Sequence, residues 1–329
     1  MVCNTYELIN MTCISVIEMD IKEKEKQKEK TEKKSNNRNK ATKQKTENKE
    51  NEEKIVRHTV IVGRNGLIDF ENSFSNNNIS LDKAKYNHYN KLADKTYRNI
   101  IKLNEHNIAI TSNSVIPGGE NKLIIFNLFK KEIKETIEGY SFIASTNGMT
   151  VIKEKYLLCA CKSYSEYQKN GILLVILNYE ENTNSKAKLF DTGEFEVYCF
   201  CPIKDLILDK QYVIGSDYSV ETDFFFVGGF DKKKREGKIK LFKFEKDEFD
   251  NVKGIKYLQD IDIDKTEEIL RKDEEGTNKT KERFEGFKGA ISSMIQSTGY
   301  KNILVSCYDG KIYLLSKPNL LGYNIKLNY

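Results

Sequence analysis

The sequence predicts an all-β fold, built from one four-stranded unit that is repeated about five times. Apolar residues come in short runs rich in Ile, Val, Phe and Tyr, separated by Gly, Asn, Asp and charged clusters, which is typical of β-strands. Long stretches with the 3.6-residue period of an amphipathic helix are missing. Pairs of apolar runs around a turn also recur along the chain, with a spacing of roughly 40–50 residues that indicates a structural repeat.

Each unit is centred on a predicted hairpin. In chain order the five hairpins are HTVIVGRNGLIDF (58–70), NIAITSNSVIPGGENKLIIFNL (107–128), YLLCACKSYSEYQKNGILLVIL (156–177), FFFVGGFDKKKREGKIKLF (224–242) and NILVSCYDGKIYLLS (302–316). Two of the turns contain Asn65-Gly66 and Asp309-Gly310, dipeptides that tight hairpin turns favour because they tolerate positive φ. The other three turns are longer and carry extra polar residues.

A further strand is expected on either side of each hairpin. The preceding strands are CISVIEM, NIIKLN, GMTVIK, EVYCFCPI and AISSMIQS, and the strands that follow the second to fifth hairpins are KEIKETI, KAKLFDT, IKYLQDIDI and YNIKLNY. The fourth strand of the first unit, between Glu71 and Asp94, is poorly marked. We therefore expect residues 1–21 to hold the first strand and residues 55–329 to form the rest of the β domain.

Four antiparallel strands in a unit of this length predict the blade of a β-propeller. The units resemble WD40-like propeller repeats, and NILVSCYDGKIYLLS is the best match, with small residues before an Asp-Gly turn and an alternating strand after it. The resemblance covers about 230 of the 329 residues and is one of pattern. The chain has no Trp, so the Trp-Asp pair is absent, and so is the Gly-His pair. The resemblance implies the fold and a protein-binding role, but no His/Asp network.

Five units leave three arrangements open: a five-bladed ring, a ring with further blades that the pattern does not mark, or an incomplete piece of a longer gene product. A ring commonly closes by pairing strands from the two ends of the chain, since an open sheet edge invites aggregation. CISVIEM near the N-terminus and YNIKLNY at the C-terminus are candidates for that pairing.

The positive charge of the chain lies in one polar tract. Residues 22–54 contain 13 Lys or Arg and 8 Asp or Glu, which accounts for the whole formal net charge of +5. With almost no apolar residue, this tract is expected to be a disordered insertion. It is either a solvated spacer or an arm for nucleic acid or anionic lipid. Polar insertions are also expected at 204–222 and at 264–283, the second with a helical turn.

The composition argues against membrane and secretory classes. No apolar run approaches the ~18–20 residues of a membrane helix, and the first twenty residues lack the basic start and apolar block of a secretory signal. Seven cysteines in a chain of this size favour thiols in a reducing compartment. We therefore expect a cytoplasmic protein, with the nucleus as an alternative.

Two motifs could suggest a ligand site, one for phosphate and one for zinc, but packing in the core explains both better. Gly228-Gly229 before the lysine run lacks the Gly-x4-Gly-Lys-Ser/Thr spacing of a phosphate loop and leads into a strand, so small side chains at a close approach explain it better. Cys159, Cys161, Cys199 and Cys201 form two pairs that would suit zinc. They lie inside apolar strands, however, so we expect reduced, metal-free thiols.

Nothing in the sequence forms a catalytic motif. The three histidines, His58, His88 and His106, have no Cys or Ser beside them in a recognisable nucleophile arrangement. The aromatic residues in the strands, Tyr198 among them, are expected to pack in the core. We expect neither catalytic residues nor a cofactor.

We expect a non-catalytic interaction module instead. In a propeller, the turns between second and third strands gather on one face with the links between blades. The candidate partner-binding residues on that face are Tyr164, Tyr167, Lys232, Lys233, Lys234, Arg235 and Asp309. Its basic corner fits a protein or peptide with acidic residues, although the two tyrosines could also pack on their own loop. The alternatives are a nucleic-acid-associated protein that uses the 22–54 arm and an enzyme with an unrecognised site in the propeller centre.

Overall fold

The structure is a computed structural model that describes fifteen segments of the chain. These segments contain β-strands and no helix. The segments are residues 13–23, 54–63, 66–73, 85–88, 96–113, 121–143, 147–163, 169–180, 183–206, 219–261, 268–272, 279–283, 286–296, 302–316 and 326–327.

Apart from one two-stranded sheet, the strands form five antiparallel sheets that follow one another along the chain, which we call blades one to five. Blade one contains β1 (Cys13–Glu23), β2 (Lys54–Gly63), β3 (Gly66–Ser73) and β4 (Lys85–His88). Blade two contains β5 (Thr96–Lys102), β6 (Asn107–Asn113), β7 (Lys122–Asn127) and β8 (Glu132–Glu138). Blade three contains β9 (Tyr140–Phe142), β10 (Met149–Ile152), β11 (Tyr156–Ser163), β12 (Asn170–Ile176) and β13 (Lys186–Gly193).

Blades four and five follow the same order. Blade four contains β14 (Phe195–Leu206), β15 (Ser219–Asp231), β16 (Glu236–Lys246) and β17 (Val252–Asp260). Blade five contains β20 (Ile291–Gln296), β21 (Asn302–Cys307), β22 (Ile312–Ser316) and β23 (Lys326–Leu327). The predicted fold class is confirmed: each expected hairpin lies at the centre of one blade, and the poorly marked fourth strand of the first unit is β4.

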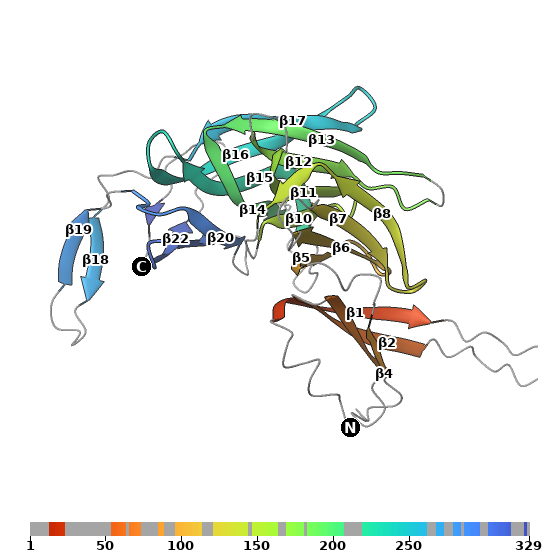
Figure 1. Ribbon diagram of the computed structural model, residues 1–329. Coiled ribbons are helices and arrows are strands. Elements are labelled where there is room, and N and C mark those ends of the chain that lie inside the picture. The colour runs from red at the N-terminus through yellow and green to blue at the C-terminus, as the bar shows by residue number, and fades with distance from the viewer. Residues whose placement is uncertain are drawn as a thin grey trace, which may run out of the picture.

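The blades are arranged as in a propeller. The first strands of successive blades are neighbours, because β1 contacts β5, β5 contacts β10, β10 contacts β14 and β14 contacts β20. Figure 1 shows the sheets fanned along an arc, with an opening between the fifth blade and the first. Among the described strands no extensive contact joins these two blades. The described part of the chain is therefore an open series of five blades.

The expected closure between the two ends of the chain is wrong. The segment CISVIEM lies in β1, which pairs with β2, and YNIKLNY supplies β23, which pairs with β22. Each segment thus completes its own blade, because the neighbouring strand in sequence is the nearest available partner.

Each pair of neighbouring blades packs around its own hydrophobic core. Val60 and Tyr97 lie between blades one and two, and Phe225 belongs to the core between blades three and four. The approach is close between blades four and five, where a Cβ on Gly228 would lie 2.7 Å from both Cys199 Sγ and a side-chain carbon of Ile291. Apolar residues on both faces of a strand are thus explained by the blades on either side.

Described strands extend into the stretches that the sequence predicts as polar insertions. The strands β1 and β2 reach to Glu23 and Lys54, which pair with one another, so residues 24–53 lie outside the described residues. β14 extends to Leu206 and β15 begins at Ser219, which leaves 207–218 outside them. In the stretch 264–283, where a helical turn is expected, the described residues form an antiparallel pair, β18 (Glu268–Lys272) and β19 (Lys279–Arg283), and the rest of the stretch lies outside the described residues.

Candidate partner-binding surface

The basic stretch Lys232–Arg235 forms the turn between β15 and β16, and its four side chains are exposed as the sequence predicts. Asp231 orders this turn: its carbonyl oxygen accepts from Arg235 N at 2.7 Å, and its Oδ1 accepts from Lys234 N at 3.0 Å. Arg235 takes a left-handed conformation with φ of 56°. An aspartate at the start of a turn commonly bonds the backbone in this way, so the basic side chains stand on an ordered backbone.

Glu196, at the start of β14, connects this turn to blade three. Its Oε1 accepts from Lys232 Nζ at 3.1 Å and from Lys162 Nζ, and only 13% of its side chain is exposed. Partial burial opposes ionisation, but the hydrogen bonds from the two ammonium groups outweigh it and hold the pKa of Glu196 below its usual value. The carboxylate therefore stays charged and joins two blades.

Two tyrosines continue the surface toward blade five. Tyr198 donates to Glu196 Oε2 at 3.4 Å, and its ring meets that of Tyr308 edge to face, with centroids 5.8 Å apart. Tyr308 is 62% exposed. The expected core position of Tyr198 is wrong: Tyr198 alternates with the buried residues Val197 and Cys199, and its ring is half-buried on the same side of the strand as Glu196.

Asp309, in the turn between β21 and β22, mainly shapes its own hairpin. Its Oδ1 accepts from Lys311 N and its Oδ2 from Tyr313 Oη, both at 3.0 Å. Burial opposes its ionisation, but the backbone N–H of Lys311 and the other donors lower the pKa of Asp309. The other two candidates, Tyr164 and Tyr167, lie outside the described residues.

We call the surface formed by these groups the basic-turn cluster; its residues are Lys162, Glu196, Tyr198, Lys232–Arg235 and Tyr308. The sequence had indicated only the turn. Alternating polar residues at Glu196 and Tyr198 on an otherwise apolar strand were a weak signal. Nothing local could pair Glu196 with Lys162, which lies on another blade.

The two cysteine pairs do not meet. Cys159 and Cys161 lie in the core between blades two and three, whereas Cys199 and Cys201 lie in the core between blades four and five. Burial raises the pKa of Cys161 to about 12 and also raises that of Cys159 and Cys199. A protonated thiol is neither a metal ligand nor a nucleophile, and the described residues contain no group of three or more His, Cys, Asp or Glu that could hold a metal ion.

The glycine pair before the basic turn has a packing role. A Cβ on Gly229 would overlap the carbonyl oxygen of Glu196 and lie 2.8 Å from the ring of Phe195. The chain then enters β16, a strand, where a phosphate loop would require a helix. This confirms the interpretation of Gly228-Gly229 as positions of close approach.

Within the described residues there is no helix of the length and hydropathy that a membrane span requires. No family model matches the chain, and no curated protein matches it.

The chain is similar to several solved structures. Kuenenia stuttgartiensis hydrazine synthase matches with 8% identity and a TM-score of 0.48, over 80% of this chain and 68% of that one. The β-propeller domain of Myceliophteria thermophila Cps50 (Swd1) matches with 9% identity and a TM-score of 0.42, over 83% and 67%. A putative 6-phosphogluconolactonase from Bacteroides fragilis matches with 13% identity and a TM-score of 0.37, over 83% and 79%. Likenesses this weak carry no argument about activity.

Proposed function

We propose that this chain is a non-catalytic protein-interaction module, a scaffold or adaptor of the WD40-like kind, which engages an acidic protein or peptide through the basic-turn cluster. The observation that carries the proposal is the ordered presentation of Lys233, Lys234 and Arg235 on a turn held by Asp231. Because the turn is ordered before binding, less conformational entropy is lost when a partner docks.

The chemistry of the cluster supports an acidic partner. Lys232 is bonded to Glu196, while Lys233, Lys234 and Arg235 extend from the turn into solvent. The exposed ring of Tyr308 lies on the same surface, and tyrosine is a frequent interface anchor. Carboxylates on a partner would meet the basic side chains, and an apolar group would meet the ring. Tyr164 and Tyr167, which lie between β11 and β12 in the sequence, are proposed as further contacts.

The proposal includes a reducing compartment, the cytoplasm or the nucleus. The five cysteines whose side chains the structure describes are free and buried, which agrees with thiols that stay reduced.

The test is binding of a fluorescent poly-glutamate peptide to the full chain. We expect Lys233→Ser combined with Lys234→Ser to weaken binding about fivefold, since two exposed ion pairs contribute roughly 1 kcal/mol together. The matched control is Lys102→Ser combined with Lys256→Ser, which removes the same charge from exposed positions elsewhere. Equal affinity for both double variants would refute this site.

A nucleic-acid function is the other outcome of the same experiment. A single-stranded oligonucleotide that displaces the peptide, with affinity falling steeply as salt rises, would indicate phosphate binding. Repeating the measurement without residues 24–53 would then show whether the charged tract supplies that affinity.

A further inference from the structure

A large hollow in the described part of the chain lies on the opposite face from the basic-turn cluster. It is formed between blades three and four by the turn from β10 to β11, the start of β13 and the turn from β16 to β17. These turns lie at the other end of the strands, because consecutive turns of an antiparallel sheet alternate between its two ends. The hollow is open and measures about 1370 Å³.

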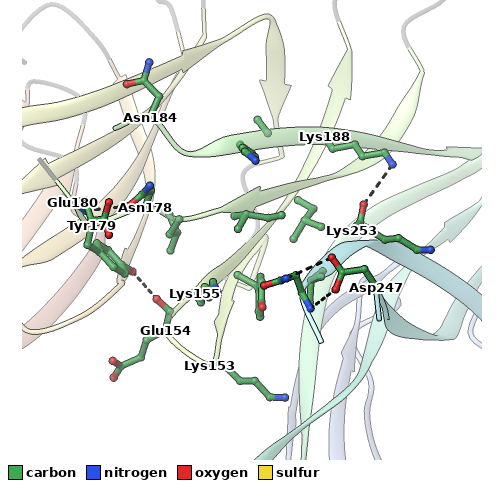
Figure 2. A pocket seen from close by; sticks show the side chains of 18 residues that line it. Lys153, Glu154, Lys155, Asn178, Tyr179, Glu180, Asn184, Lys188, Asp247 and Lys253 are labelled. Carbon is green, nitrogen blue, oxygen red and sulfur yellow. Dashed lines mark hydrogen bonds between the residues drawn. The ribbon is translucent and has the colours of Figure 1, made fainter. Parts of the chain in front are cut away.

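We call this hollow the lysine groove. Figure 2 shows Lys188 and Lys253 along one side of it, and Lys153 and Lys155 along the other. Lys186 joins Lys188 on the outer strand of blade three, two residues apart and therefore on the same face. Between these lysines lie apolar side chains, which include Tyr156, Ile176 and Val252.

Three of these lysines have no carboxylate partner among the described residues: Lys155, Lys186 and Lys188. Lys188 donates only to the carbonyl oxygen of Lys253, at 3.5 Å, and lies over the ring of Phe190. The Nζ of Lys155 lies 5.9 Å from the centroid of the Tyr156 ring. By contrast, Lys153 forms an ion pair with Asp223, with 2.6 Å between its Nζ and the Oδ1 of Asp223. The groove thus carries positive charge that the protein itself does not neutralise.

Three acidic residues line the groove: Asp247, which accepts backbone hydrogen bonds, and Glu154 and Glu180, which lie at the end near Tyr179. Asp247 uses its Oδ1 to accept the backbone N–H groups of Phe249 and Asn251, at 2.9 and 2.8 Å, and these bonds order the turn and lower its pKa. Glu154 and Glu180 lie beside Tyr179, at the end away from Lys188 and Lys253 in Figure 2. The end of the groove at Lys188 and Lys253 therefore carries one carboxylate, that of Asp247, whereas the end at Tyr179 carries two.

The size and lining of the groove favour a peptide over a small molecule. Its volume exceeds the ~300–1,000 Å³ that is common for small-molecule sites. A smaller hollow of about 630 Å³ between blades two and three shares Tyr179, Glu180 and Asn184 with it, so the path continues across blade three. At the blade-four end, the ordered turn presents Phe249, which is 76% exposed, as a further apolar contact.

We propose that the lysine groove binds an extended peptide segment in which acidic and apolar side chains alternate. Carboxylates of the segment would pair with Lys186 and Lys188, while its apolar side chains would lie over Tyr156, Ile176 and Val252. In an extended chain successive side chains point to opposite sides, which suits a groove with charged rims and an apolar floor. This site is separate from the basic-turn cluster and goes beyond the function proposed for it.

The experiment uses the full chain and a short fluorescent peptide that alternates Leu and Glu, with an otherwise identical Leu and Gln peptide as the neutral probe. We expect the Glu peptide to bind about tenfold more tightly than the Gln peptide. Lys186→Glu combined with Lys188→Glu should weaken binding of the Glu peptide about tenfold, because two exposed pairs become two repulsions. Lys102→Glu combined with Lys256→Glu makes the same charge change outside the groove and should change affinity less than about twofold.

Three further outcomes decide the proposal. Lys233→Ser combined with Lys234→Ser should leave this binding unchanged, and a loss there would assign the peptide to the basic-turn cluster. Hydrogen exchange should show protection in β13 and β17 when the Glu peptide binds. Equal binding of both peptides, no binding of the Glu peptide, or its displacement by single-stranded RNA would overturn the proposal.

Discussion

Blades four and five have the same strand pattern but different surroundings. Both faces of blade four are covered: Phe225 stacks on Phe242 on the side of blade three, and Phe226 packs on the side of blade five. Among the described residues, blade five is covered only on the side of blade four. Along β21, Ile303 is 5% exposed and Leu304 is 41% exposed. An apolar strand is therefore buried by its neighbouring blades, and the strand pattern alone does not show whether both neighbours are present.

The largest effect is expected within blade four. Gly229→Leu should lower the free energy of unfolding by about 3 kcal/mol, because even a Cβ at this position would overlap the carbonyl oxygen of Glu196. Chemical denaturation with a spectroscopic readout would measure the change. A silent substitution would show that the approach of β14 and β15 is looser than the structure describes.

The two faces of blade five can be compared with a matched pair of substitutions. Ile303→Ala should cost about 3 kcal/mol, because a buried side chain leaves a cavity. Leu304→Ala removes an isomeric side chain from the exposed face and should cost less than about 1 kcal/mol. Equal costs in denaturation would contradict the difference, and would mean that the outer face of blade five is also covered in solution.

The link between blades three and four should depend on pH. Glu196→Gln should cost about 1 kcal/mol at neutral pH, since it breaks a half-buried ion pair with Lys162 and Lys232. The folded-state pKa of Glu196 is depressed, so its stabilisation is present above the unfolded pKa of ~4.3 and is lost as pH falls below it. Unfolding curves of both proteins should therefore converge in acid, and a constant difference would argue against the pair.

A smaller effect is expected at the basic turn. Changing Lys232, Lys233, Lys234 and Arg235 together to Ser should alter stability by no more than about 1 kcal/mol, because all four side chains are exposed. Most of any loss should come from Lys232, since its bond to Glu196 is the one ion pair that the turn makes with other described residues. Restoring Lys232 alone should then recover stability, and failure to do so would question that pair.

The smallest effect is expected from removing residues 24–53. Glu23 and Lys54 are paired at the ends of β1 and β2, so an Asn-Gly turn could join the two strands directly. We expect the melting temperature to change by less than ~2 °C, since this tract has almost no apolar residue to bury. A loss of several degrees would show that the tract packs on the propeller.

The order of the strands could be predicted from the sequence because it depends on local patterns. Period-two alternation, runs of apolar residues and Asn-Gly or Asp-Gly turns each depend on a few neighbouring residues. The exposed turn Lys232–Arg235 followed in the same way, since a run of unpaired charges is costly to bury. The paired strands β18 and β19 were missed, because charged residues such as Glu268 and Lys272 obscure a strand pattern.

Only the tertiary structure decided which residues of different blades lie close together. Glu196 meets Lys162, and Lys186, Tyr156 and Val252 line the same groove, although these residues lie on separate strands and in part on separate blades. Which blades are in contact depends on how twisted sheets stack and which faces they cover. Side-chain periodicity shows that one face of a strand is apolar, but it does not show which element packs against that face. The sequence therefore determined the blades, and the packing of the blades created both candidate surfaces.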